Sequence, residues 1–145
     1  MVTSRNRILM RYLLDTNFIS ELRKGEKANR GVQTWAMNND SSLSALSVVT
    51  IAEIREGIEN KRCTDDRQAD NIESWLETIL IKFAANILPV TVEIADRWGR
   101  LMSRSQLPRH DSLLAATALE HGLTVVTRNV VDFKGSGARF HNPWK

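Results

Sequence analysis

Residues 10–24 read "MRYLLDTNFISELRK", and this stretch decides how the rest of the chain is interpreted. The apolar run Tyr12–Leu14 is typical of a short buried strand, and the apolar residues after Thr16 recur at helical spacing. Asp15 stands between the two elements. A carboxylate at the end of a buried strand either caps the next helix or belongs to a functional site. This stretch alone favours the cap.

Outward from this stretch, predicted strands and helices alternate along the chain. Such alternation indicates an α/β fold with a parallel sheet covered on both faces. Gly122 is expected to end one helix, because glycine adopts the left-handed conformation that closes helices. Further strands are predicted at 43–50, 86–90, 123–127 and, as an edge strand, 138–144. Helices are predicted at 16–24, 31–39, 50–61, 66–84, 91–102 and 111–122, with a turn or short helix at 128–133.

Length and composition indicate one domain of ordinary globular type. The chain has 145 residues, of which 42% are apolar and 26% charged. We expect a single domain over residues 10–145, preceded by a flexible extension at residues 1–9. The single cysteine and the lack of a signal-peptide pattern are typical of a cytoplasmic protein. No stretch has the roughly 20 apolar residues of a membrane span. The net charge of +3 is compatible with a nucleic-acid partner without establishing one.

Polar side chains with oxygen atoms follow several of the predicted strands. Asp15 follows the first strand, Glu53 begins the helix after the second, and Asn129 and Asp132 follow the strand at 123–127. Asp111 opens the preceding helix. Parallel α/β sheets bind ligands at the carboxyl ends of their strands, so these side chains are expected to meet there. Oxygen ligands without matching histidine or cysteine favour Mg²⁺ or Mn²⁺, and such a site suits phosphodiester hydrolysis.

Each acid also has a purely structural explanation. Thr50 to Glu53 reads as a capping box, which would make Glu53 a helix-start device. Asp111 in a first helical turn is stabilised by the helix dipole, and Asp132 could simply close a turn. The shared position of the acids at strand ends is therefore the stronger signal.

Neighbouring polar residues are weaker candidates. Thr16 and Thr127 could orient a ligand or phosphate, although capping and strand propensity explain them equally well. Arg128, Arg109 and His110 could contact an RNA backbone, and ordinary solvation is an equal alternative for each. The histidines are scattered through the sequence and show no metal-binding spacing.

The segments "YLLDTNFISELR", "TIAEIREGI", "DSLLAATALEHGLTVVTRN" and "NPW" resemble PIN-domain ribonuclease toxins of the VapC/FitB type. The resemblance implies a three-layer α/β/α sandwich and a Mg²⁺-dependent (or Mn²⁺-dependent) endoribonuclease. Asp15, Glu53 and Asp111 match the family's central acids, which are its catalytic and metal-binding residues. Asn129 stands where a fourth acid is common, and Asp132 could contribute through a bound water.

The resemblance also implies partners. Besides an RNA substrate, we expect a homodimer and a cognate antitoxin that inhibits the nuclease and alone contacts operator DNA. The alternative is a catalytically inactive PIN-like module that binds RNA or protein, for which Asn129 is the only support. A phosphatase would need an acid at Asn17, and a response-regulator receiver would need a late lysine that "LTVVTRN" lacks.

Overall fold

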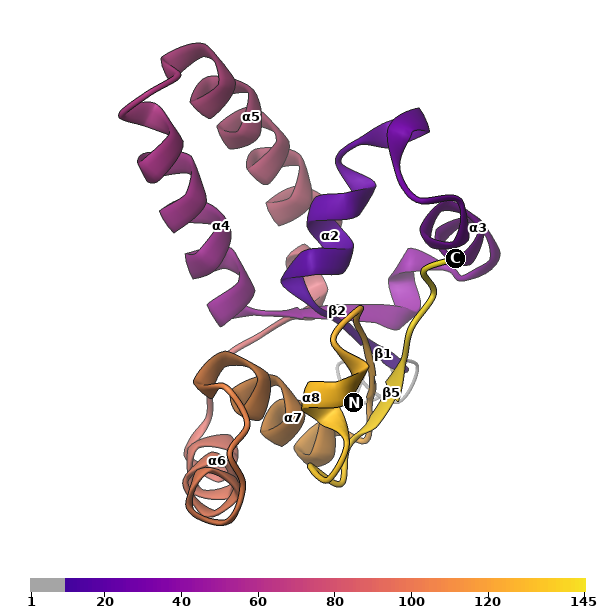
Figure 1. The fold of residues 1–145 in the computed structure, drawn as a ribbon, viewed down its shortest axis with the longest axis vertical. Helices are drawn as coiled ribbons and strands as arrows, with labels where there is room; N and C mark the ends of the chain where they lie inside the picture. The colour runs from indigo at the N-terminus through magenta and orange to yellow at the C-terminus, as the bar shows by residue number, and fades with distance from the viewer. Residues whose placement is uncertain (1–9) are drawn as a thin grey trace.

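A computed structural model of the protein describes residues 10–145, so the extension predicted at residues 1–9 lies outside the described residues. The described chain forms a parallel five-stranded sheet with the strand order β3-β2-β1-β4-β5 (Figure 1). The predicted parallel sheet is therefore confirmed. The strands are β1 (Tyr12–Leu14), β2 (Ser44–Ser47), β3 (Ile87–Leu88), β4 (Thr124–Val126) and β5 (Arg139–His141).

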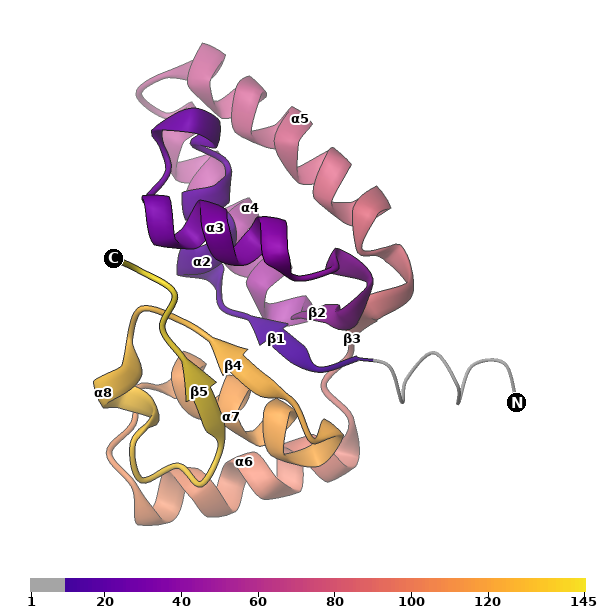
Figure 2. The ribbon, with the colours of Figure 1, turned by 90° about the vertical axis from the view of Figure 1, so that its right-hand side faces the viewer.

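Helices cover both faces of the sheet and complete the expected three-layer sandwich (Figures 1 and 2). One layer holds α2 (Thr16–Leu22), α3 (Arg30–Asn38), α4 (Val48–Arg62) and α5 (Asp66–Lys82). The other layer holds α6 (Val92–Arg104), α7 (Arg109–His121) and α8 (Val130–Phe133). Short 3-10 turns lie at Gly25–Lys27, Ser41–Leu43 and Ala84–Asn86. Among residues 10–145, no helix has both the length and the apolar character needed to cross a membrane.

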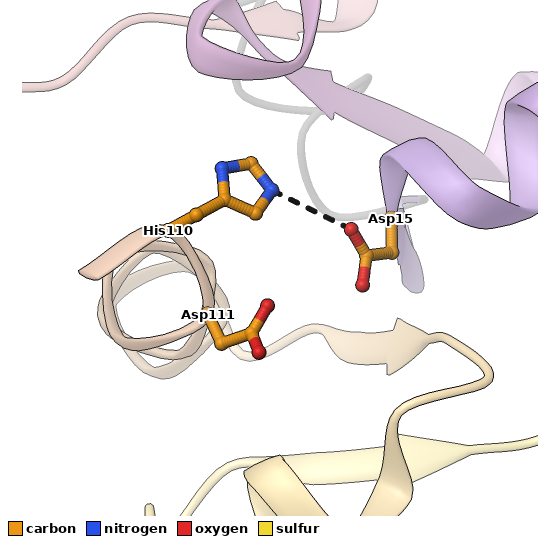
Figure 3. Close-up of side chains that lie close together, drawn as sticks. All are labelled: Asp15, His110 and Asp111. Carbon is orange, nitrogen blue, oxygen red and sulfur yellow. Dashed lines mark ion pairs between the residues drawn. The ribbon is translucent and has the colours of Figure 1, made fainter. Parts of the chain in front are cut away.

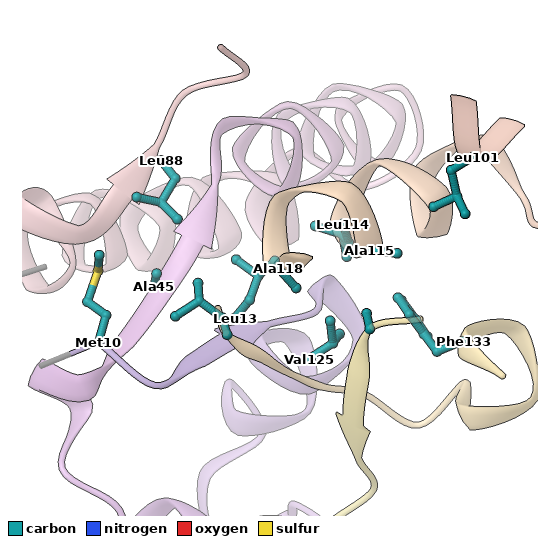
Figure 4. Packing of buried hydrophobic residues seen from close by; sticks show 12 residues of the cluster. Met10, Leu13, Ala45, Leu88, Leu101, Leu114, Ala115, Ala118, Val125 and Phe133 are labelled. Carbon is teal, nitrogen blue, oxygen red and sulfur yellow. The ribbon is translucent and has the colours of Figure 1, made fainter. Parts of the chain in front are cut away.

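The central strands are buried on both faces because successive side chains of a strand point to opposite sides. Leu13 packs in the cluster beneath α6 and α7, whereas its neighbour Leu14 packs in the cluster beneath α2 and α4. Val125 and Val126 divide in the same way. Figure 4 shows Leu13 and Val125 close to the apolar face of α7. Both layers are thus anchored to β1 and β4.

Two helix starts differ from the sequence prediction. The second strand ends at Ser47, whose hydroxyl caps α4 by accepting from the N–H of Val49 at 3.1 Å. The capping box predicted at Thr50 to Glu53 is therefore wrong, because the helix is already under way there. Helix α7 begins at Arg109 rather than Asp111, directly after Pro108. Gly122 ends α7 with a φ of 67°, as its sequence position predicted.

The order of the strands fixes where a site can form. From β1 the chain moves outward to β2 and β3, and it later returns to place β4 on the other side of β1. The switch point therefore lies between β1 and β4, where ligands bind in open α/β sheets. The N–H of Asp15 donates to the carbonyl of Val126 at 3.0 Å, so Asp15 and Thr127 sit side by side there.

Candidate active site

Asp15 serves as a helix cap and as a member of a polar cluster at the same time. Its side chain is buried, with 3% of the residue surface exposed. Oδ1 accepts from the N–H of Thr16 at 2.7 Å, and Oδ2 accepts from the hydroxyl of Thr127 at 2.8 Å. Asn17 also lies near, with its amide nitrogen 3.5 Å from Oδ2. The two explanations offered by the sequence therefore do not exclude one another.

Asp111 reaches the same edge of the sheet from the first turn of α7. It is 5% exposed and lies beside Asp132 of α8. Burial, a hydrogen bond shared with Asp132 and the negative charge of Asp15 together raise the pKa of Asp111 to about 7. Such a shift marks a carboxylate whose negative charge is poorly compensated in the protein.

Glu53 approaches from the second turn of α4, on the opposite layer. Its carboxylate accepts a short hydrogen bond from the hydroxyl of Thr16. Burial alone would raise the pKa of Glu53, but the interactions with His110 and Thr16 outweigh burial and lower it. Glu53 is therefore held in its ionised form at neutral pH.

Sequence reasoning considered His110 only as a contact for an RNA backbone and missed its place in the acid cluster, because the sequence showed no metal-binding spacing around it. Its Nε2 lies 3.0 Å from Glu53 Oε1 and 3.5 Å from Asp15 Oδ1, and Figure 3 shows the ring between Asp15 and α7. Burial lowers the pKa of His110, but contact with the two carboxylates more than offsets this and raises it to about 9. The imidazolium is the cation that balances this side of the cluster. The one available signal was its position next to Asp111.

The remaining predicted residues lie around the cluster and range from fully buried to exposed. Thr127 is fully buried, and its hydroxyl donates to Asp15 while accepting from the N–H of Asn129 at 3.0 Å. Asn129 itself is exposed at the start of α8, and its side chain forms no capping bond. The guanidinium of Arg128 packs 5.8 Å from the ring centre of Trp144. Sequence reasoning also missed the part of Asn17, which contacts Asp15 and Thr127.

The donor atoms of the cluster suit a cation. One atom each from Asp15, His110 and Asp111 lie within 4.8 Å of one another. Both nitrogens of His110 are buried without a well-directed hydrogen bond in the described chain, so the ring is held by charge rather than by a fixed network. Together with the raised pKa of Asp111, this arrangement indicates excess negative charge that a divalent ion would offset.

Comparisons with known proteins agree with this architecture. The PIN domain family matches residues 12–134. The chain is 32% identical over 139 residues to VapC ribonuclease Y4jK of Sinorhizobium fredii, covering 92% of this chain and 97% of the relative.

Solved structures give the same result. The crystal structure of FitAcB from Neisseria gonorrhoeae superposes with a TM-score of 0.83 at 32% identity, covering 92% of this chain and 98% of the other. A toxin–antitoxin complex from Klebsiella pneumoniae superposes with a TM-score of 0.71 at 26% identity, covering 92% and 98%. The chain therefore belongs to the PIN-domain family and is of the VapC/FitB toxin type.

Proposed function

We propose that the protein is a Mg²⁺- or Mn²⁺-dependent endoribonuclease and the toxin component of a type II toxin–antitoxin pair. The observation that supports the proposal is the group of Asp15, His110 and Asp111 at the switch point of the sheet, whose donor atoms lie within 4.8 Å of one another, with Glu53 3.0 Å from His110. The likeness to a VapC ribonuclease supports hydrolysis of RNA over other phosphodiester chemistry.

In this proposal Asp15 and Asp111 hold the cation and Glu53 completes its shell. Carboxylate oxygens are the ligands that hard divalent ions prefer, and such sites keep open positions for water and phosphate. When bound, the ion would act as a Lewis acid and neutralise charge that develops on the phosphate. His110 must give up its contacts with Asp15 and Glu53, because a dication there and an imidazolium would repel each other.

The chain's own residues would position the reaction. Thr127 and Asn17 hold the Asp15 carboxylate in a fixed orientation. Glu53, whose carboxylate accepts a hydrogen bond from the hydroxyl of Thr16, accepts a proton from the attacking water as the water oxygen bonds to phosphorus. The bond to the leaving oxygen then breaks, and that oxygen takes a proton from solvent. Asn129 and Asp132 have weaker roles, with Asp132 acting beside Asp111.

The proposed partners follow from the family. Complex formation in the Klebsiella toxin–antitoxin structure supports a cognate antitoxin for this chain. We further propose that the protein forms a homodimer and contacts operator DNA only through the antitoxin.

Cleavage of total cellular RNA by the purified, antitoxin-free protein tests the proposal. Wild type is compared with Asp111→Asn, in Mg²⁺, in Mn²⁺ and with chelator. Cutting that requires both the metal and Asp111 is the expected result. A well-folded protein that neither cuts RNA nor binds metal would instead be the inactive RNA- or protein-binding module.

A further inference from the structure

The first turn of α7 carries both His110 and Asp111, and it has no side-chain cap of its own. Pro108 precedes the helix and forms no capping hydrogen bond. A helix start is commonly stabilised by a side-chain oxygen that accepts from its free N–H groups, as Asp15 does for α2. The position of the first turn of α7 therefore depends on contacts with other elements.

Trp98 of α6 supplies such a contact through Ser112. The indole Nε1–H of Trp98 donates to the hydroxyl of Ser112 at 2.9 Å, and that hydroxyl donates to the carbonyl of Arg109 at 2.9 Å. Ser112 is fully buried and directly follows Asp111 in the chain. Helix α6 lies against α7 (Figure 1). The two bonds thus tie the first turn of α7 to its neighbouring helix.

A small apolar cluster connects the same place to the opposite layer. Its members are Ile94 of α6, Leu113 and Ala116 of α7, and, packed against these, Val49 of α4 and Trp98. Each of the two larger clusters holds helices of one layer only. In the described chain, helices of the two layers therefore meet directly in the small cluster. Val49 lies one turn before Glu53, so both side chains are on the same face of α4.

We propose, resting on the proposed function, that Trp98 is a positioning residue for the acid centre. Its indole N–H orients the first turn of α7 through Ser112, and its ring sets how closely α7 approaches α4 at the small cluster. Trp98 thereby keeps the carboxylate of Asp111 close to that of Asp15. Hydrogen bonds that orient metal ligands typically change metal affinity by about 10–100-fold when they are removed.

Binding of Mn²⁺ to the antitoxin-free full chain tests the proposal. Isothermal titration at pH 7 compares chains with and without Trp98→Phe, in a His110→Ala background where the imidazolium no longer competes for the site. Trp98→Phe keeps an aromatic ring but removes the N–H, and it should raise the Kd for Mn²⁺ by about tenfold without changing the number of sites. An unfolded fraction of the protein would instead lower the number of sites and leave the Kd unchanged.

Cleavage of RNA at saturating Mn²⁺ gives a second measurement in the otherwise wild-type chain. Trp98→Phe should lower kcat by about tenfold and leave KM unchanged, because Trp98 orients a carboxylate of the centre rather than the RNA. Ser112→Ala should have the same effect, since it removes the hydroxyl that joins Trp98 to α7. The double variant should lose no more than the weaker of the two single variants, because both changes break the same bond.

Matched controls lie on α3 and α7. Trp35→Phe changes a partly buried tryptophan whose ring packs edge-on against Tyr12 and Phe18. Thr117→Val removes a buried hydroxyl that, within residues 10–145, bonds only to the carbonyl of Leu113. Both controls should leave the Kd for Mn²⁺ and the kcat unchanged, even where urea unfolding shows the same loss of stability as in the test variants. Equal losses of kcat in a test variant and its control would overturn the proposal.

Amide hydrogen exchange in the metal-free protein separates this proposal from the proposed function. The N–H of Ser112 donates to the carbonyl of Pro108 at 2.9 Å in the first turn of α7. Its exchange should be about tenfold faster in Trp98→Phe and unchanged in Trp35→Phe. If wild type neither binds Mn²⁺ nor cuts RNA while this exchange is faster, the nuclease proposal fails and Trp98 still holds the turn. If wild type binds and cuts while Trp98→Phe matches it in Kd and kcat, the positioning role is overturned.

Discussion

On one side of the acid centre Asp15 and Glu53 face the imidazolium of His110, whereas on the other side Asp111 and Asp132 face each other. The first pair is balanced by a cation that belongs to the chain. In the second pair Asp111 is relieved mainly by keeping a proton, because burial, the hydrogen bond with Asp132 and the charge of Asp15 raise its pKa to about 7. A divalent ion therefore gains most from the second pair and competes with His110 at the first.

The largest effect should come from removing charge on the unbalanced side. Asp111→Asn should lower RNA cleavage by about 1,000-fold or more, the scale of losing a catalytic group. The same change should leave the metal-free protein as stable as wild type or more so, because it removes a buried like charge. Asp96→Asn, which removes an exposed paired carboxylate from α6, is the control. Full activity of Asp111→Asn would remove Asp111 from the mechanism.

Removal of Asp15 should affect both function and folding. Asp15→Ala should relieve the growth arrest caused by expressing the protein alone. It should also lower the free energy of unfolding by about 1 kcal/mol or more, since α2 loses its cap. Growth assays and urea unfolding measure the two effects. Undiminished toxicity of a folded Asp15→Ala protein would contradict the role assigned to the carboxylate.

His110→Ala should show whether the His110 side chain competes with the metal ion or binds it. If the imidazolium competes with the metal, its removal should strengthen Mn²⁺ binding at pH 7 by about tenfold, which is about 1.4 kcal/mol. Isothermal titration of wild type and variant, both in the absence of antitoxin, gives the two affinities. His121→Ala, at the far end of α7, is a matched control. Weaker Mn²⁺ binding in His110→Ala would instead make the imidazole a metal ligand.

The two sides of the acid centre should also respond differently to pH when no metal is bound. The pKa of Asp111 is raised from 3.8 to about 7, so its protonated form stabilises the fold and that contribution is lost as the pH rises through 7. The pKa of His110 is raised from 6.5 to about 9, so its contribution is full below 6.5 and lost by about 9. Both groups therefore predict a Tm that falls from pH 5 to 9.

Single variants should show which side of the acid centre causes each part of the fall in Tm. With chelator present, Asp111→Asn should flatten the profile below pH 7, and His110→Gln should flatten it above pH 7. Added Mg²⁺ should reduce the fall in Tm, because a bound ion would stabilise the ionised form of Asp111. An identical slope in wild type and both variants would show that other groups cause the pH dependence.

Thr127 orients Asp15 from β4. Thr127→Val keeps the shape but removes a hydroxyl that bonds Asp15 and the N–H of Asn129. We expect a loss of about 1–3 kcal/mol in the free energy of unfolding, the range for unsatisfied buried polar groups. Thr117→Val is the control, because within residues 10–145 that buried hydroxyl bonds only to a carbonyl of its own helix. Equal losses in the two variants would contradict a special role for Thr127.

Much of the fold could be predicted because it depends on local patterns of apolar and polar residues in the sequence. The alternation of strands and helices predicted the parallel sheet, and the position of Asp15 after a strand and of Asp111 at the start of a helix predicted that the two would meet at one edge of it. Contacts between distant elements cannot be read from the spacing of residues, which is why the contacts of His110 with Asp15 and Glu53 were missed. Its importance depends on α7 beginning at Arg109 and presenting the ring to residues of β1 and α4. The cap of α4 was misplaced because Thr50 and Ser47 are equally good cap residues, and only the true strand end distinguishes them.

The pairing of β1 with β4 has a consequence for the timing of synthesis. The hydrogen bond between Thr127 and Asp15 joins residues 112 apart in the chain. A nascent chain on the ribosome has made Asp15 and Glu53 long before Asp111 and Thr127 emerge. The centre cannot be assembled until the last quarter of the protein has been translated and β4 has inserted beside β1, a slow non-local step. There is thus an interval during synthesis in which most of the polypeptide exists without its acid centre.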